Sequence, residues 1–138
     1  MNEKVFEKAT EIISSKMAHC VLALMDSNDY PTASSITVSK NDGIKWVTFC
    51  TGLDANKVKR IEKCGRASVC FFSSESWYNI TLAGKIEVIT DPETKKEMRY
   101  DGLEHHFTGA EDKNYCVLKF ATERYNLWVD NEDAEGIL

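Results

Sequence analysis

The sequence predicts a mostly β protein of the α+β class: a small antiparallel β-barrel of six or seven strands with helices at its periphery. Short apolar runs follow one another through brief turns, which is typical of antiparallel pairing. Only one predicted helix, at 55–64, lies between two strands, whereas a doubly wound parallel sheet needs many such units. The length of 138 residues suits one domain with a sizeable core.

The amino-terminal half is expected to contain two helices and three strands. Apolar residues from Val5 to Met17 recur at helical spacing and predict an amphipathic helix. The segment 40–43, with Asn and Asp before Gly, is a hairpin signal because these residues tolerate positive φ. Asp54 can cap the second helix, either directly or within a capping box that begins at Thr51. These signals place helices at 3–16 and 55–64 and strands at 18–25, 32–39 and 44–50.

The carboxy-terminal half is expected to consist mainly of strands. The run 77–90 is too long for one flat strand, and its Gly84 marks a bulge or bend. Asp91 followed by Pro92 is a helix start, because proline fits the first helical turn. We expect strands at 67–72, 77–90, 115–122 and 124–129, and a third helix that runs to about Tyr100. Residues 130–138 are expected to form a flexible acidic tail, so that 1–138 is a single domain.

Charge and cysteine content argue against several classes of protein. The formal net charge of −5 gives no overall attraction to nucleic-acid phosphates, so no nucleic-acid partner is expected. The sequence shows no signal peptide and no apolar run long enough to span a membrane. The five cysteines form no CxxC pair and lie mostly in apolar runs, so reduced thiols in a cytoplasmic protein are expected.

The stretch FCTGLDANKVKRI, at 49–61, is a candidate anion site. An apolar strand ends at Thr51-Gly52, and a helix that carries Lys57 begins a few residues later. A helix N-terminus offers unpaired N–H groups and a partial positive charge, to which Lys57 adds a full charge. The alternative is a capped surface helix with solvated lysines, and the motif taken alone favours that alternative.

A strand rich in small polar residues is the second candidate. Ser34, Ser35, Ile36 and Thr37 lie close to a tight turn, and their small side chains leave the backbone accessible to a flat polar ring. An ordinary exposed strand face is the alternative, and it is favoured when the strand is judged in isolation. Trp77 follows the polar segment 73–76 and can line such a pocket or a subunit contact, although core packing is the default for an aromatic residue.

Neither a metal site nor a catalytic constellation is predicted. His105 and His106 are adjacent, so their side chains point apart on regular structure, and no further ligands occur at suitable spacing. The sequence contains no GxSxG, P-loop or GxGxxG motif. If the chain is an enzyme, a bound cofactor is therefore expected to carry the chemistry.

Taken in order, these pieces resemble the pyridoxamine 5′-phosphate oxidase-like flavoproteins, the FMN-binding split barrels, and among them the short general-stress-protein branch. The resemblance covers about Lys16 to Phe120. It rests on the order and spacing of several features. These are the amino-terminal helix and first strand, the strand PTASSITV, the hairpin with Gly43, the turn FCTGLDANK, the helix that ends at Gly65, VCFF, and the long strand with LAGKIEV.

The resemblance implies a split β-barrel that forms a homodimer with FMN held between the subunits. The strand at 34–37 would run along the isoalloxazine ring and the ribityl chain. The turn at Cys50 and Thr51, together with Lys57, would hold the phosphate. Asn79 stands where the oxidases place a glutamine that reaches the flavin.

Two departures from the oxidases bear on activity. Asn56 stands where they carry an arginine, and Ser34 stands where they carry another basic residue. Each lost charge-assisted contact should weaken phosphate binding by about 1–3 kcal/mol. The carboxy-terminal segment of the oxidases has no counterpart here, so true pyridoxamine 5′-phosphate oxidase activity is not expected.

Three functions follow from these expectations. The first is an FMN-dependent oxidoreductase of unknown small-molecule substrate, with hydride transfer at flavin N5 and no side chain needed as acid or base. The second is a non-catalytic flavin carrier or stress sensor, which the missing charges at Ser34 and Asn56 favour. The third is a barrel that binds no flavin and works through its dimer surface, or that holds another flat cofactor such as haem through His105 and His106.

Overall fold

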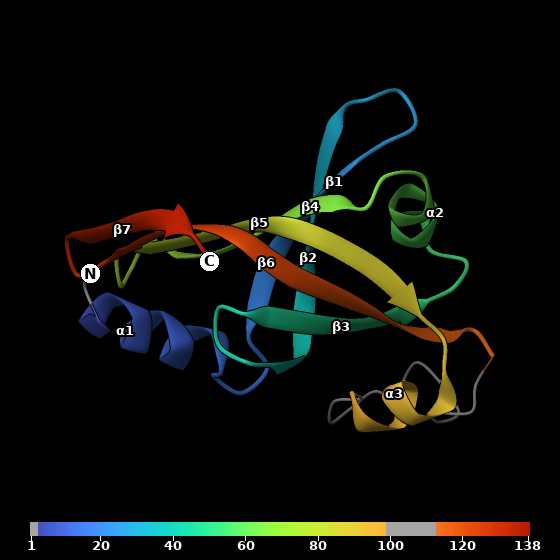
Figure 1. The fold of residues 1–138 in the computed structure, drawn as a ribbon, viewed down its shortest axis with the longest axis horizontal. Coiled ribbons are helices and arrows are strands. Elements are labelled where there is room, and N and C mark those ends of the chain that lie inside the picture. Colours follow the sequence, from blue (N-terminus) through green and yellow to red (C-terminus); the bar gives the residue numbers. More distant parts are fainter. Residues whose placement is uncertain (1–2, 99–112) are drawn as a thin grey trace.

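The computed structural model describes residues 3–98 and 113–138, which form one seven-stranded sheet and three helices (Figure 1). The predicted α+β fold class is confirmed. The helices are α1 (Glu3–Ile13), α2 (Asn56–Lys63) and α3 (Pro92–Glu97). The strands are β1 (His19–Met25), β2 (Pro31–Asn41), β3 (Trp46–Gly52), β4 (Arg66–Ser73), β5 (Tyr78–Ile89), β6 (Tyr115–Val129) and β7 (Glu132–Ile137).

The sheet closes on itself to form an antiparallel barrel. Its strand order is β3-β2-β1-β4-β5-β6-β7, and β3 also pairs with β6. That additional pairing extends from Trp46↔Ala121 to Gly52↔Tyr115 and joins the two ends of a six-stranded sheet. β7 pairs only with the second half of β6, at 124–129, and therefore extends the sheet beyond the closed barrel.

The core fills the inside of the barrel, and two helices pack on the strands. Phe49, Phe71 and Leu118 point inward and are almost completely buried. The buried stripe of α1, Val5, Ala9 and Ile13, belongs to the same core, and α1 packs along β6 and β7 (Figure 1). α2 lies at the other end of the barrel, where it packs against β5 and β1.

Gly84 lies at a bulge between β5 and β6, as predicted. The register changes from Ala83↔Arg124 to Gly84↔Thr122, so Glu123 is an extra residue of β6. A Cβ atom on Gly84 would lie 2.0 Å from the backbone oxygen of Ala121, which excludes any side chain there. β6 continues through this bulge, so the two strands predicted at 115–122 and 124–129 are one strand.

The last residues form a strand where the sequence indicated a flexible acidic tail. Asp130 and Asn131 have φ values of 52° and 63°, as a two-residue type I′ hairpin turn requires. This turn joins β6 to β7, and the backbone N–H of Leu138 donates to the Glu123 oxygen at 2.9 Å. Lys8 on α1 forms an ion pair with Asp130, so the helix contacts the hairpin as well.

Replacing Asn131 by alanine is expected to lower the free energy of unfolding by about 1 kcal/mol, because a Cβ-bearing residue without a polar side chain disfavours positive φ. Denaturant unfolding of the two proteins measures this difference. Asn131→Gly is the matched control and should keep or raise the stability, since glycine adopts positive φ without strain. A glycine variant as unstable as the alanine variant would show that the turn conformation is not responsible.

Several helix boundaries differ from those predicted. α1 ends at Ile13, three residues early, and Met17 then adopts a φ of 56°. α3 begins as predicted, with the Asp91 side chain accepting a hydrogen bond from the Thr94 N–H at 3.0 Å. α3 ends at Glu97, with Met98 as its C-cap, so it is about three residues shorter than predicted; Tyr100 itself lies outside the described residues. None of the helices placed within 3–98 and 113–138 has the length and apolarity needed to cross a bilayer.

Candidate functional site

The first part of β2 has an open edge. β2 pairs with β1 along 31–37, but it pairs with β3 only along 38–41. Along residues 31–37 β2 diverges from β3 and extends away from it, on the side where α2 lies (Figure 1). In the strand at 34–37, which was predicted to bind a flat ring, the backbone groups that face away from β1 therefore make no hydrogen bonds with β3.

The alternation of hydrogen bonds identifies the residues that face this edge. The Val38 N–H donates to the Ala18 oxygen at 2.8 Å, on the β1 side. Because the direction alternates along an antiparallel pair, Ser35 and Thr37 direct their backbone groups toward the open edge. A flat polar ligand could hydrogen-bond to these groups.

The four side chains of this strand point in two directions. Ser34 and Ser35 are exposed, whereas Ile36 is half-buried and packs against the barrel core. The Thr37 hydroxyl lies 3.1 Å from His19 Nε2 on the neighbouring strand. Ile36 thus contributes packing, while the serines and Thr37 remain at the surface or near it.

The predicted anion turn joins β3 to α2. Its N-cap residue is Ala55, which makes no side-chain hydrogen bond to the helix, so the predicted cap at Asp54 is wrong. Asp54 instead lies against the turn, where its Oδ1 would be 2.8 Å from a Cβ added to Gly52. The absence of a side-chain cap leaves the first N–H groups of α2 open to a ligand.

The charge in the first turn of α2 is the reverse of the usual preference. This turn contains no acidic residue, and it carries the half-buried Lys57 after the exposed Asn56. A cation opposes the partial positive charge of a helix N-terminus, at a cost of about 0.3–1 kcal/mol. A bound anion beside Thr51 would reverse that effect.

The side chain of Cys50 points away from this turn. Its thiol donates to the Met98 oxygen at 3.3 Å and lies 3.5 Å from the Tyr115 hydroxyl. Burial raises the pKa of the Cys50 thiol, although the hydrogen bonds from Tyr115 and Ser39 oppose that effect. Cys50 can therefore contribute backbone groups to an anion site, but its side chain belongs to the packing between β3, β6 and the segment after α3.

Asn79 lies on a different part of the barrel from the β2 strand. Its Oδ1 accepts hydrogen bonds from the Cys70 thiol at 3.3 Å and from the Thr81 hydroxyl at 3.4 Å. The register Ser35↔Val21↔Cys70↔Thr81 places three strand spacings between β2 and β5. Three spacings amount to about 14 Å, so one chain does not bring Asn79 next to Ser35.

Asn79 belongs to an uncharged patch on the outside of the sheet, here called the outer patch and formed by Val21, Cys70, Phe72, Trp77 and Asn79. The exposed fractions of Phe72 and Trp77 are 61% and 67%, and Trp77 has an unusual φ of 52°. Large exposed apolar patches commonly mark interaction sites. The exposure of Phe72 was not predicted, because in the sequence it belongs to the uniformly apolar run VCFF.

The cysteines differ strongly in their environments. All five are free thiols. Burial raises the pKa of Cys20 to about 12 and that of Cys116 to about 11. The pKa of Cys64 is instead lowered, first by hydrogen bonds from the backbone and side chain of Arg66 and then by its charge.

The described residues contain no group of three or more His, Cys, Asp or Glu side chains that could hold a metal ion. His105 and His106, which the sequence offered as haem ligands, lie outside the described residues.

The chain is similar to known proteins in sequence and in fold. A family model described as pyridoxamine 5′-phosphate oxidase matches residues 6–129. A protein related to general stress protein 26 from Clostridium acetobutylicum has a TM-score of 0.89 at 23% identity, with 100% of this chain and 97% of that chain covered. General stress protein 26 from Bacillus anthracis gives 0.79 at 21% identity, with 96% and 98% covered.

A heme binding protein from Mycobacterium smegmatis has the same fold, with a TM-score of 0.78 at 18% identity; the match covers 99% of this chain and 59% of that one. The search of curated proteins returned no match. The match of the family model over most of the chain confirms the resemblance recognised in the sequence: this chain belongs to the pyridoxamine 5′-phosphate oxidase family.

Proposed function

We propose that the protein binds FMN as a homodimer and acts as a flavin-dependent oxidoreductase on a small molecule. One observation carries the proposal: the first turn of α2 has no side-chain cap and bears Lys57 where acidic residues are preferred. The family supports flavin as the ligand, because an FMN phosphate is the kind of anion that such a turn binds.

Each element of the site has its own role in holding the cofactor. The α2 amides, the Thr51 hydroxyl and Lys57 would bind the phosphate. The backbone of Ser35 and Thr37 would hydrogen-bond to the polar edge of the ring along the open side of β2. When bound, the flavin supplies hydride transfer, and the barrel supplies orientation and charge.

A second copy of the chain would complete the site. Asn79 and Trp77 lie too far from β2 to reach a ring bound there in the same chain, because three strand spacings separate β2 from β5. The outer patch is uncharged and mostly apolar, and its Phe72 and Trp77 are exposed, which suits a self-complementary contact. Asn79 of the partner subunit would then reach the flavin from across the interface.

The cofactor content of the purified protein tests the proposal. Protein purified without added cofactor, or after incubation with FMN, should show the visible absorption of oxidised flavin, retained on gel filtration at the mass of a dimer. A colourless protein that does not take up added FMN would refute flavin binding. A Soret band would instead indicate haem, as the heme binding neighbour allows.

A non-catalytic flavin carrier is the second candidate, and the neutral residues Asn56 and Ser34 favour it. Turnover of a reduced nicotinamide with an electron acceptor separates the two functions. An oxidoreductase should exceed free FMN at equal flavin concentration, whereas a carrier should match it or fall below it.

A further inference from the structure

A concave site lies beside the outer patch, on the same face of the sheet. The cavity has a volume of about 630 Å³, which is within the usual range for small-molecule sites. Ala23 and Ser68, on its floor, are each two residues along β1 and β4 from Val21 and Cys70 of the outer patch. Two residues of strand separate the two places by about 7 Å, and Phe72 and Asn79 lie at the far side of the patch.

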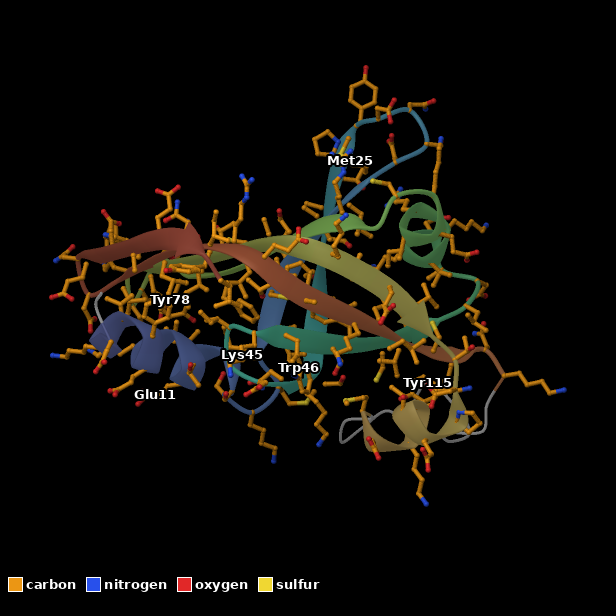
Figure 2. All side chains as sticks on the ribbon, viewed as in Figure 1. Glu11, Met25, Lys45, Trp46, Tyr78 and Tyr115 are labelled. Atoms are coloured by element: carbon orange, nitrogen blue, oxygen red, sulfur yellow. The ribbon has the colours of Figure 1, made fainter. Side chains whose placement is uncertain are left out.

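The floor of this cavity is flat because one row of the sheet carries small side chains. Ala23, Ser68 and Ala83 lie opposite one another in the register of β1, β4 and β5 and line the cavity together. Met25 and Pro31 form an apolar wall at the base of the β1–β2 hairpin, which projects beyond the barrel (Figure 2). A flat apolar body would therefore fit on the floor and against this wall.

Two guanidinium groups line the same cavity from different strands. Arg66 comes from the start of β4, and Arg124 lies directly beside Ala83 across the β5–β6 pair. The bulge at Glu123 bends β6 at this point and brings Glu123 and Arg124, neighbours in the chain, to one cavity. With one carboxylate against two guanidinium groups, the net charge of these three side chains is positive.

The two arginines are available to an anion. Within residues 3–98 and 113–138, neither Arg66 nor Arg124 takes part in an ion pair. Guanidinium groups bind carboxylate, phosphate and sulfonate oxygens in a bidentate manner.

We propose that this cavity, here called the arginine cavity and defined by Ala23, Arg66, Ser68, Ala83 and Arg124, binds a small organic anion that has a flat apolar body. The anionic group lies between the two arginines, and the body covers the small-residue floor. This site is separate from the proposed flavin site, and its occupation does not depend on bound flavin.

Two probes with almost the same hydrocarbon framework test the proposal. 8-Anilinonaphthalene-1-sulfonate carries an anionic group, and N-phenyl-1-naphthylamine lacks it; both report binding by fluorescence. Titration of the full chain should give one saturable sulfonate site per chain. In Arg124→Gln the dissociation constant of the sulfonate should rise about tenfold or more, as expected for one lost charge-assisted contact, while that of the neutral probe stays nearly constant.

Lys85→Gln is the matched control for Arg124→Gln. Lys85 pairs with Arg66 across β4 and β5, but it does not line the cavity, so its loss should leave both affinities nearly unchanged. Ala83→Leu, which fills the floor, should weaken both probes while the near-ultraviolet circular dichroism stays native. Unchanged sulfonate binding in Arg124→Gln, or equal losses of both probes, would overturn the proposal.

The test also separates this site from the flavin site. Sulfonate binding should be the same in Lys57→Ala and in protein saturated with FMN. Competition between FMN and the sulfonate, together with weaker sulfonate binding in Lys57→Ala, would place the probe in the flavin site and overturn the inference. If the protein binds no flavin at all, the arginine-dependent binding should still be observed.

Discussion

Gly84→Ala is expected to lower the free energy of unfolding by about 3 kcal/mol, which is large for the addition of one methyl group. The added Cβ would lie 2.0 Å from the Ala121 oxygen and 3.0 Å from the Glu123 nitrogen. Both atoms belong to the backbone of β6, so no side-chain rotation relieves the overlap. β5 and β6 would have to separate at the bulge, next to the place where β3 joins β6.

Denaturant unfolding of Gly84→Ala and the parent protein measures this loss, provided that both transitions are two-state. Gly65→Ala is the control, because its Cβ would lie 3.2 Å from the Ile86 oxygen and needs a shift of only a few tenths of an ångström. Similar losses in both variants would mean that the general cost of a side chain, and not the close approach at the bulge, sets the stability.

Lys57→Ala is expected to raise the dissociation constant of FMN by about 10- to 100-fold, the effect of removing one charged hydrogen-bond partner. Riboflavin, which has the same ring but no phosphate, should bind almost equally to both proteins. Only a ligand with a phosphate gains from the ammonium group beside the uncapped amides of α2.

Titration of flavin fluorescence measures all four affinities. Lys59→Ala is the matched control, because Lys59 is an exposed lysine of the same helix, whereas Lys57 is half-buried. It should change FMN binding much less than Lys57→Ala does. Equal weakening of FMN and riboflavin in Lys57→Ala would show that Lys57 does not contact the phosphate.

Most strands could be predicted because the turns between them carry local signals, and their number favoured a barrel, but the strand pair that closes it could not be predicted. Gly43 marks a hairpin turn that needs positive φ, and Gly84 marks a bulge that has no space for a side chain. Both signals are local and can be recognised in a single sequence. The pairing of Trp46 with Ala121 joins residues far apart in the chain, and no local pattern encodes such a contact.

The strand β7 was missed for a different reason. Its acidic composition is typical of a disordered tail, and only Ala134 and Gly136 turn toward partly buried surroundings, so the apolar alternation of a strand is weak. The signal was in the turn, since Asp130-Asn131 is a pair that tolerates positive φ at both positions.

The residues of the candidate site were predicted from the sequence, but their distribution over two separate parts of the surface was not. Lys57 and the strand 34–37 are local features, and the structure places them in the first turn of α2 and in β2, as expected. Asn79 and Trp77 lie three strand spacings from β2, because the sheet order puts β1 and β4 between β2 and β5. Strand order depends on long-range pairing, so the sequence alone could not show that Asn79 lies far from the strand 34–37 within one chain.

The position of β6 in the chain has a consequence for synthesis. β6 is the strand that completes the barrel against β3 and that also carries β7, and it follows the other five strands of the closed barrel in the chain. Hairpins such as β1–β2 and β4–β5 can form earlier, but until β6 emerges from the ribosome β3 and β5 each keep an unpaired edge. Between the synthesis of β5 and that of β6 the nascent chain therefore exposes two unpaired strand edges, and chaperone binding in this interval would protect it from aggregation.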